Sequence, residues 1–221
     1  MKKVLIIGGK GNGSVIGDAI IDANRKGNRE LGFAGYINDR DGVKEIEGKP
    51  VMGGLVDVPR FIDEGYHFIF TLYKFDCQPE RIRLFESLKI PDDRLATFVH
   101  PSAYLSHNVE LSPGCVILPN VSITSSTRFG KSSCVRPGTT IGHNNVFGDH
   151  TSITAGASLG SHISIGTGSF IGLKACVKEY MHIGDYAMVG MGAVVINDIG
   201  DGELWVGNPA KCLRKALWMK D

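Results

Sequence analysis

His143 lies in the segment TTIGHNN, residues 139 to 145, whose surroundings consist mainly of small and aliphatic residues. A purely structural segment of this kind would be expected to use serine, threonine or glycine two residues after Ile141. An imidazole instead titrates near neutral pH and is the side chain that most often transfers a proton in catalysis. His143 is therefore the first candidate for acid–base chemistry.

A second candidate is the glycine-rich segment GGKGNG, residues 8 to 13, which follows an apolar segment and precedes a helical pattern. A turn from a strand into a helix presents backbone N–H groups at the positive end of the helix, and this arrangement suits phosphate. The pattern is weak alone, because a tight turn without a ligand has the same sequence. Nucleotide-sugar binding fits it better than a dinucleotide cofactor, since the sheet behind it is roughly half the size that dinucleotide sites need.

The stretch around His143 belongs to a repeat with a period of six residues. Every sixth residue from Leu105 to Val195 is valine, isoleucine, leucine or phenylalanine, and glycine often follows it directly. The residue four positions after each of these is usually small or moderate in size, as at Thr127 and Ala157. The pattern predicts short parallel strands joined by tight corners, with two inward side chains in each hexad and with glycine relaxing the backbone at the bend.

Three hexads are expected to form one triangular coil, so that residues 18 apart in the sequence lie above one another. No long loop interrupts the repeat, so another part of the chain or a neighbouring subunit must hold any substrate. Beyond Val195 the repeat fades, and we expect a short basic helix from Cys212 to Met219 to cap the last coil. A sandwich of short strands is the alternative, but it would not keep a strict six-residue period over this length.

Strand and helix patterns alternate in the first hundred residues. Strands are predicted at 3–7, 33–37 and 66–72, and helices at 15–26, 56–63 and 81–89. Such alternation predicts a small Rossmann-like parallel sheet. The expected organisation is thus an α/β Rossmann-like domain, which binds a nucleotide sugar, over residues 1–98, followed by an all-β parallel β-helix domain with a short C-terminal helix over residues 99–221.

Three features occur together with this repeat: the glycine-rich lobe, a junction His100-Pro101-Ser102-Ala103 and a closing Gly207-Asn208-Pro209-Ala210-Lys211 element. In this combination the chain resembles the NeuD/PglD-like sugar acyltransferase family, whose members are hexapeptide-repeat acetyltransferases with an N-terminal Rossmann-like domain. The resemblance spans essentially the whole chain. It implies a left-handed parallel β-helix and an acetyl-CoA-dependent acetyltransferase that forms a homotrimer with active sites between subunits.

The resemblance also implies roles around His143. In that family a catalytic histidine follows an aliphatic residue by two positions and precedes a segment ending in Ile-Gly and an acidic residue, and IGHNNVFGD, residues 141–149, is similar. His143 is then expected to be the general base. The family usually has a carboxylate next, whereas this chain has Asn144, which can orient the imidazole but cannot stabilise its protonated form. One coil further on, the backbone N–H of Ser161 is expected to stabilise the oxyanion.

The co-substrate acetyl-CoA is expected in the groove between neighbouring helices, in contact with Gly160, Ser161, His162, Lys178 and Lys211, with Lys174 and Arg214 as further basic candidates. The acceptor is expected at the glycine-rich turn, where the residues concerned are Gly9, Lys10, Gly11, Asn12 and Gly13. Asn38 or Asp39 is expected to contact ribose or base. Arg136 stands where the family often has asparagine, and a cation there suits a phosphate or carboxylate of the acceptor.

The predicted function is transfer of an acetyl group to the amino group of a nucleotide-linked amino sugar. One alternative is a sugar hydroxyl O-acetyltransferase of the sialic acid type. Less favoured are a zinc carbonic-anhydrase-like β-helix and a non-catalytic sugar-binding scaffold. No metal site is predicted, because His143, His150 and His162 lack the spacing of the zinc-binding β-helices.

Bulk composition excludes some classes of partner. The 24 basic and 23 acidic residues nearly balance, which argues against nucleic-acid or membrane-surface binding through net charge. The five cysteines are widely spaced and predict buried thiols in a reducing compartment, not disulfides or a zinc site. The opening segment MKKVLIIGG is too short for a signal peptide or a membrane span, so we expect a cytoplasmic protein.

Overall fold

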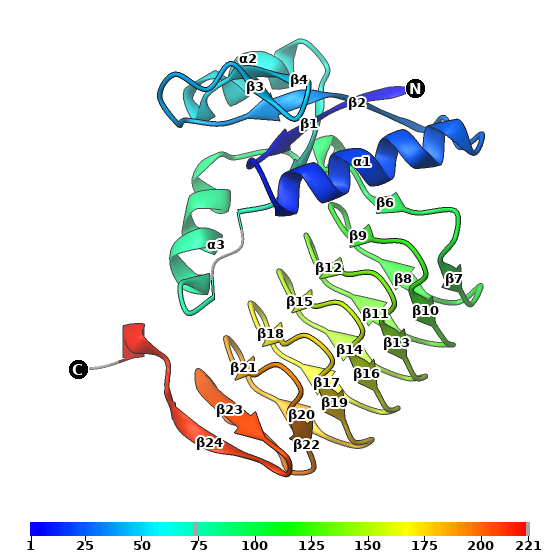
Figure 1. Ribbon diagram of the computed structural model, residues 1–221, viewed down its shortest axis with the longest axis vertical. Helices are drawn as coiled ribbons and strands as arrows, with labels where there is room; N and C mark the ends of the chain where they lie inside the picture. The colour runs from blue at the N-terminus through cyan, green and yellow to red at the C-terminus, as the bar shows by residue number, and fades with distance from the viewer. Residues whose placement is uncertain (73–74, 220–221) are drawn as a thin grey trace.

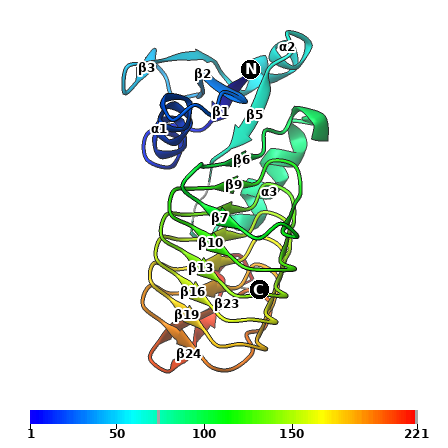
Figure 2. The same ribbon diagram turned by 90° about the vertical axis from the view of Figure 1, so that its right-hand side faces the viewer.

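The computed structural model describes residues 1–72 and 75–219, of which Met219 is described only in its backbone. An N-terminal lobe lies at one end of a stack of β-coils, and a C-terminal hairpin lies at the other end (Figure 1). The same stack viewed from the side shows how regularly one coil follows the next (Figure 2).

The N-terminal lobe is built on a five-stranded sheet of order β3-β4-β2-β1-β5. All neighbours pair in parallel except β3 and β4, which form an antiparallel hairpin. The strands are β1 (Lys2–Ile7), β2 (Leu31–Ile37), β3 (Glu45–Ile46), β4 (Lys49–Gly53) and β5 (His67–Phe70). The hairpin was not predicted, because its two short strands carry few aliphatic residues.

Helices cover both faces of this sheet. Alternate side chains of β1 point to opposite faces, so Val4 and Ile6 pack with α1 while Leu5 and Ile7 pack with Phe61 and its neighbours. The helices are α1 (Asn12–Arg25), η1 (Leu55–Asp57), α2 (Val58–Asp63), α3 (Gln78–Ser87) and η2 (Asp92–Arg94). Each strand and helix predicted for this lobe is present, with ends displaced by a few residues.

The hexapeptide repeat forms a parallel β-helix of three faces. The first face contains β7 (Tyr104–Leu105), β10 (Ser122–Ile123), β13 (Thr140–Ile141), β16 (Ser158–Leu159), β19 (Cys176–Val177) and β22 (Val194–Val195). The second face contains β8 (Glu110–Leu111), β11 (Arg128–Phe129), β14 (Val146–Phe147), β17 (Ser164–Ile165) and β20 (His182–Ile183). The third face contains β6 (Phe98–Val99), β9 (Val116–Ile117), β12 (Cys134–Val135), β15 (Ser152–Ile153), β18 (Phe170–Ile171), β21 (Met188–Val189), β23 (Glu203–Gly207) and β24 (Ala210–Lys215).

Residues 18 apart stack in register, as the repeat predicted. Ile123, Ile141 and Leu159 pair in one column, and all three are buried. The rings of Phe129 and Phe147 stack with centroids 4.4 Å apart and planes 4° apart. The small residue of each hexad also points inward and is buried: Thr127, Ser133, Thr139, Thr151, Ala157, Ser169, Ala175, Ala187 and Ala193. The predicted core of the β-helix is therefore confirmed.

The glycine that follows the aliphatic residue has a different role from the one predicted. The bends take positive φ three residues after the aliphatic position, as at Asn144 (φ 59°) and His162 (φ 58°), and many of these residues are not glycine. Gly142 itself has no positive φ, but a Cβ there would lie 2.6 Å from the carbonyl oxygen of Gly160 in the next coil. Glycine permits close approach of successive coils and does not make the bend.

The predicted helix from Cys212 to Met219 is wrong. Residues of this segment form β24, which pairs antiparallel with β23, and only the short 3-10 helix η3 (Leu217–Met219) follows. The free N–H and C=O groups at the edge of the last coil favour a paired strand over a helix, because pairing satisfies them directly. The hairpin therefore closes the coil that the helix was expected to cap.

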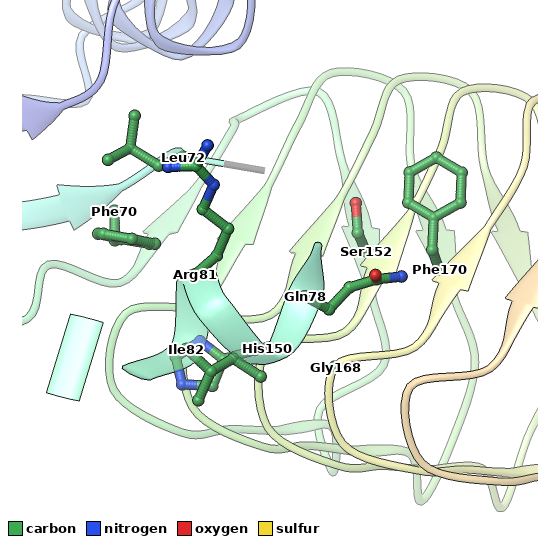
Figure 3. Close-up of a pocket in the computed structure, with 9 residues that line it drawn as sticks. All are labelled: Phe70, Leu72, Gln78, Arg81, Ile82, His150, Ser152, Gly168 and Phe170. Atoms are coloured by element: carbon green, nitrogen blue, oxygen red, sulfur yellow. The ribbon is translucent and has the colours of Figure 1, made fainter. Parts of the chain in front are cut away.

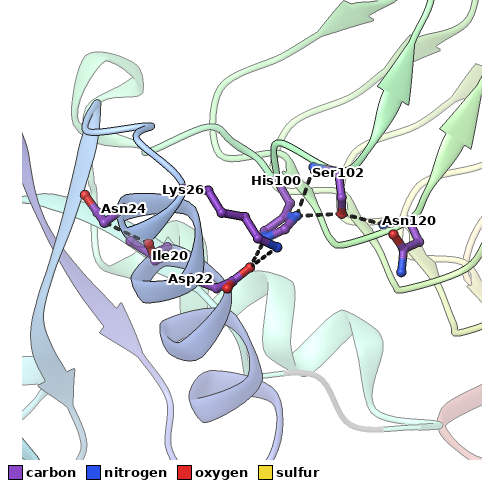
Figure 4. Close-up of polar contacts among 7 residues, drawn as sticks. All are labelled: Ile20, Asp22, Asn24, Lys26, His100, Ser102 and Asn120. Atoms are coloured by element: carbon purple, nitrogen blue, oxygen red, sulfur yellow. Dashed lines mark hydrogen bonds and ion pairs between the residues drawn. The ribbon is translucent and has the colours of Figure 1, made fainter.

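Two sets of contacts fasten the lobe to the β-helix. Apolar side chains of α1 and β1 share one core with Val116, Leu118 and Cys134 of the coils. Beside this core, the buried ring of His100 donates from Nε2 to Asp22 of α1 over 2.9 Å (Figure 4). The Nδ1 atom accepts from the hydroxyl and the backbone N–H of Ser102, over 2.8 and 3.2 Å, and this fixes the tautomer.

Asp22 also forms a 2.6 Å ion pair with Lys26 on the exposed side of the same helix. Hydrogen bonds from Lys26 and His100 hold the pKa of Asp22 below its usual value. On the other side of the junction, Asn120 donates its backbone N–H to the Ser102 hydroxyl over 3.1 Å. A continuous polar chain thus joins α1 to two successive coils.

The cysteines are all free, as predicted, but they are not all buried. Cys115 and Cys134 are buried, and burial raises the pKa of Cys115 to about 12. Cys176 and Cys212 are exposed, so the prediction of a buried thiol is wrong for these two. Among the described residues, no helix is long and apolar enough to cross a membrane.

Candidate active site

His143 lies at the corner where β13 of the first face turns into β14 of the second face, and we call this the His143 corner. Asn145, which is fully buried, holds the corner in shape. Its amide nitrogen donates to the carbonyl oxygens of Gly142 and Gly160 over 2.8 and 3.0 Å, and its amide oxygen accepts from the N–H of Ile163 over 2.7 Å. The corner is therefore fastened to the coil below it.

The ring of His143 is exposed and oriented by the next residue. Its Nδ1 lies 2.7 Å from Oδ1 of Asn144. Because an amide oxygen only accepts, Nδ1 carries the proton and donates it to Asn144. Nε2 then holds the free lone pair, which is the arrangement that a general base requires. Asn144 can adopt this place because asparagine tolerates the positive φ of the corner.

Ser161 lies one coil below His143, as predicted from the spacing of 18 residues. Its hydroxyl accepts the backbone N–H of His143 over 3.1 Å. The backbone N–H of Ser161 itself has no hydrogen-bond partner within residues 1–72 and 75–219. A backbone N–H that has no partner among the described residues, one coil from an imidazole, is available to an oxyanion.

A column of rings descends from His143. The ring of His162 contacts it edge to face, with centroids 5.2 Å apart, and stacks on Tyr180 at 4.8 Å with planes 3° apart. Tyr180 is 69% exposed and was not predicted as a site residue. Lys178 follows β19 directly, in the same column as Gly142 and Gly160. The corner therefore gathers Gly160, Ser161, His162 and Lys178 around the base, whereas Lys174 follows β18 at the corner between the third and first faces.

Three basic residues predicted from the sequence lie elsewhere. Lys211 lies in β24 of the terminal hairpin, which extends the third face. Arg214 forms a 2.8 Å ion pair with Asp76, near α3. Arg136 follows β12, at the corner between the third and first faces. The prediction that these residues share one site with His143 therefore finds no support in a single chain.

The residues predicted to bind the acceptor gather at the carboxyl end of β1 and β2. Asn38 donates its amide to the carbonyl oxygen of Gly8 over 2.9 Å. A Cβ at Gly9 would lie only 2.7 Å from that amide nitrogen, and Gly11 has a φ of 93°. Asp39 accepts the backbone N–H of Leu55 over 2.7 Å. Both glycines are thus required by the turn itself.

Two cavities open at this edge of the sheet. One, of about 280 Å³, is lined by residues that include Lys10, Asn38 and Glu47. The other, of about 320 Å³, is lined by residues that include Gly8, Asp39 and Arg81. Ligands of open parallel sheets bind in the crevice outside the carboxyl ends of the strands, which is where both cavities lie.

The acceptor crevice and the His143 corner lie on different sides of the molecule. Within the lobe, α3 extends along part of the third face: it stands beside β15 and β18, and its Phe85 packs on His150 with ring centroids 4.7 Å apart (Figure 1). In a triangular coil, the corner between the first and second faces is opposite the third face. One chain therefore does not bring His143 to its own glycine-rich turn.

The histidines considered as zinc ligands do not converge within one chain. His143 and His162 share a corner, but His150 lies at the next corner, beneath α3. In the part of the chain that the structure describes, no group of three or more histidine, cysteine or acidic side chains is arranged to hold a metal ion.

No protein-family model matches the chain, and no curated protein matches its sequence. Solved structures do match it. The acetyltransferase domain of PglB from Neisseria gonorrhoeae FA1090, in complex with acetyl coenzyme A, is 25% identical with a TM-score of 0.83, over 96% of this chain and 99% of that one. A mutant of perosamine N-acetyltransferase from Caulobacter crescentus, in complex with CoA and GDP-perosamine, is 25% identical with a TM-score of 0.83, over 97% of this chain and 98% of that one.

A third structure, WeeI from Acinetobacter baumannii AYE, has a TM-score of 0.79 at 24% identity, over 96% of this chain and all of that one, and supports the fold alone. The first two structures confirm the resemblance to hexapeptide-repeat sugar acetyltransferases, and with it the predicted class of enzyme. The first two hold acetyl-CoA or CoA, the co-substrate predicted from the sequence.

Proposed function

We propose that the protein transfers an acetyl group from acetyl-CoA to the amino group of a nucleotide-linked amino sugar, with His143 as the general base. The observation that carries this proposal is the 2.7 Å contact from Nδ1 of His143 to Oδ1 of Asn144, which leaves Nε2 free to accept a proton. Two similar enzymes, one with acetyl-CoA and one with CoA and GDP-perosamine, support the choice of co-substrate and acceptor.

The proposed reaction proceeds in two steps. The neutral amine attacks the thioester carbon, a C–N bond forms, and Nε2 of His143 takes the amine proton. The negative charge that develops on the carbonyl oxygen is stabilised by the backbone N–H of Ser161. The C–S bond then breaks, and the proton on Nε2 passes to the thiolate of CoA. No covalent bond to the enzyme is needed.

Asn144 is the positioning residue for this base. Because its amide is neutral, it orients the imidazole without stabilising the imidazolium, unlike the carboxylate that is usual in the family. His162 supports the ring from the other side, and its contact with Tyr180 extends that support to the coil below. Gly160 allows the coils to approach closely, and Lys178 supplies a cation beside the corner for the phosphates of CoA.

We further infer that the active site is shared between copies of the chain in a homotrimer. The glycine-rich turn and His143 face different sides of one chain, so the acceptor held by one copy needs the base of a neighbour. In this arrangement Gly9, Lys10, Gly11, Asn12 and Gly13 lie near the diphosphate. Asn38 and Asp39 lie near the ribose or base, while Arg136 and Lys211 contact ligand only if a neighbouring copy approaches them.

The function is tested by measuring thiol release from acetyl-CoA with a panel of UDP-, GDP- and dTDP-linked amino sugars and the corresponding free sugars. Turnover with at least one nucleotide-linked amino sugar, at a rate well above that of its free sugar, is the expected result. Turnover only with sugars that lack an amine would favour hydroxyl transfer. Absence of thiol release with every acceptor would contradict an acetyltransferase.

The shared site is tested by mixing two impaired variants. His143→Ala removes the base, while Gly11→Val strains the acceptor turn at a φ of 93° and is expected to raise the acceptor KM. After subunit exchange, one copy supplies an intact turn and its neighbour an intact base, so activity should return. If each site were built within one chain, the mixture would stay as inactive as its components. Each variant mixed with itself is the control.

A further inference from the structure

The junction between α3 and the third face holds buried polar atoms that lack partners. Among the described residues, Nε2 and Oε1 of Gln78, Nε of Arg81 and Oγ of Ser152 make no hydrogen bond. Buried polar groups are almost always paired, because each unpaired one costs free energy. Four such atoms from two separate elements in one place therefore indicate a site with a ligand of its own.

These side chains line a single cavity of about 30 Å³ (Figure 3). Arg81 extends from α3 toward Leu72, and Gln78 points from the same helix toward Ser152 and Phe170. Ser152 is only 3% exposed, and the rest of the wall is mainly apolar. Because a single water needs at least about 10–15 Å³, the cavity has room for about two atoms of that size and none for a sugar ring.

Arg81 decides the charge of the ligand. Among residues 1–72 and 75–219 it forms no ion pair, although part of its guanidinium is buried beside apolar side chains. A buried cation is normally paired, since its desolvation is otherwise uncompensated. Three of the four unpartnered atoms can donate, namely those of Arg81, Ser152 and the Gln78 amide nitrogen. The first turn of α3 adds the positive end of a helix.

The cavity and the acceptor crevice have two lining residues in common. Arg81 and Leu72 line both this cavity and the larger one that contains Gly8, Asn38 and Asp39. Oδ1 of Asp39 in this crevice accepts the backbone N–H of Leu55 over 2.7 Å. The side chain of Arg81 therefore borders both the small cavity and the crevice at the glycine-rich turn.

We propose that Arg81, Gln78 and Ser152 form an oxyanion subsite for the acceptor, in which one oxygen of a phosphate or carboxylate enters the small cavity. This rests on the proposed function only in naming the acceptor as the ligand. The oxyanion has two sources. In a nucleotide sugar it is the diphosphate, and in a free acidic sugar such as a sialic acid it is the carboxylate.

The experiment measures binding to the purified full chain by titration calorimetry, with GDP, UDP, inorganic pyrophosphate and N-acetylneuraminic acid as separate probes. Arg81→Gln keeps a polar side chain without the charge. It should raise the dissociation constant of the probe that binds about tenfold or more. Gln78→Met and Ser152→Ala should each weaken it by a smaller factor. Arg83→Gln is the matched control, because Arg83 lies exposed on the same helix and outside the cavity.

If Arg81→Gln weakens binding of GDP, UDP or pyrophosphate, the oxyanion is the diphosphate. If only the acidic sugar binds, and Arg81→Gln weakens its binding, the oxyanion is the carboxylate. Both results support the subsite. If Arg81→Gln and Arg83→Gln bind every probe as the unchanged protein does, or if no probe binds at all, the subsite is refuted. A thermal unfolding midpoint for Arg81→Gln no lower than that of the unchanged protein excludes misfolding as the cause of lost binding.

Failure of the proposed subsite can be distinguished from failure of the proposed function. Acetyl transfer that persists in Arg81→Gln with unchanged acceptor KM refutes the subsite and leaves the function intact. Oxyanion binding that depends on Arg81 in a protein without thiol release from acetyl-CoA supports the subsite and refutes the function.

Discussion

The His143 corner and the third face belong to the same coils, yet they give a histidine opposite surroundings. His143 is exposed, hydrogen-bonded through Nδ1 to Asn144, and in contact with the ring of His162 in the next coil. His150, seven residues later, packs beneath α3 against Phe85, and burial lowers its pKa. His150 lies three residues after the aliphatic position of its hexad, as His162 does, and yet His162 is exposed. What packs on a corner, and not the place of the histidine in the hexad, therefore decides whether its imidazole is exposed or packed.

The sharpest test of this contrast is His143→Ala. Loss of the base should lower kcat by about 10²–10⁴-fold, because proton transfer from the attacking amine then depends on water. Acetyl-CoA affinity and the free energy of unfolding should stay unchanged, since the ring is exposed. Steady-state kinetics and calorimetry check these outcomes. His107→Ala, in the same column two coils earlier, is the control and should be fully active. A near-normal kcat for His143→Ala would show that His143 is not the general base.

His100→Ala tests the covered side in the same manner. The substitution leaves Asp22 and the Ser102 hydroxyl without their shared partner, so the free energy of unfolding should fall by about 1–3 kcal/mol. Chemical denaturation measures the loss. His162→Ala, an exposed ring on the opposite corner, should leave the unfolding transition in place. Equal stability of the two variants would show that the polar chain does not fasten the lobe.

Asn144→Gly tests how strongly activity depends on the hydrogen bond between Asn144 and His143. Glycine accepts the positive φ of this position without strain, so the variant removes only the partner of Nδ1. We expect kcat to fall about tenfold, because the free energy of one hydrogen bond corresponds to about that factor. The KM for acetyl-CoA should stay unchanged. Asn144→Asp keeps an acceptor at the same place and should retain or exceed the original kcat. A drop of equal size in both variants would contradict the positioning role.

The smallest expected effect is the pH dependence of stability at the covered corner. Burial lowers the pKa of His150 below that of an unfolded histidine, so acid favours the unfolded chain. The free energy of unfolding should be greatest above about pH 6.5 and should decrease as the pH falls through that value. Urea denaturation at pH 7.5 and 5.5 measures the slope.

His150→Phe, which removes the titrating group but keeps a ring against Phe85, should make the slope shallower. Some slope should remain, because burial also lowers the pKa of His67. His182→Phe, at an exposed position of the second face, is the control and should leave the slope as it was. An unchanged slope in His150→Phe would show that the ring is not kept neutral by its packing.

The β-helix was predictable because each hexad repeats the same local rule. An aliphatic residue and a small residue must point inward in every hexad, so the period reveals the fold, the stacking interval of 18 and the neighbours of His143. The reason for the glycines was not predictable in the same way. Gly142 is required by a carbonyl group in the next coil, and no pattern within one hexad shows that contact.

Predictions failed where an element meets something distant in sequence. The segment from Cys212 to Met219 has a helical pattern, but the unpaired edge of the last coil turns it into a strand. Tyr180 received no role because its stacking on His162 requires two coils to be in place. Gln78 and Arg81 received no role, because only the packing of α3 on the third face brings them to one cavity.

The amino-acid sequence by itself determined the triangular coil, the alternating first lobe and the candidate base with its neighbour, because these follow from spacings of a few residues and from backbone preferences that act locally. Only the tertiary structure decided which corner the lobe covers, which histidine stays in solvent and which polar atoms lack partners. Burial and hydrogen bonding across the junction are the physical reason, since they depend on surfaces that meet only after both parts have folded.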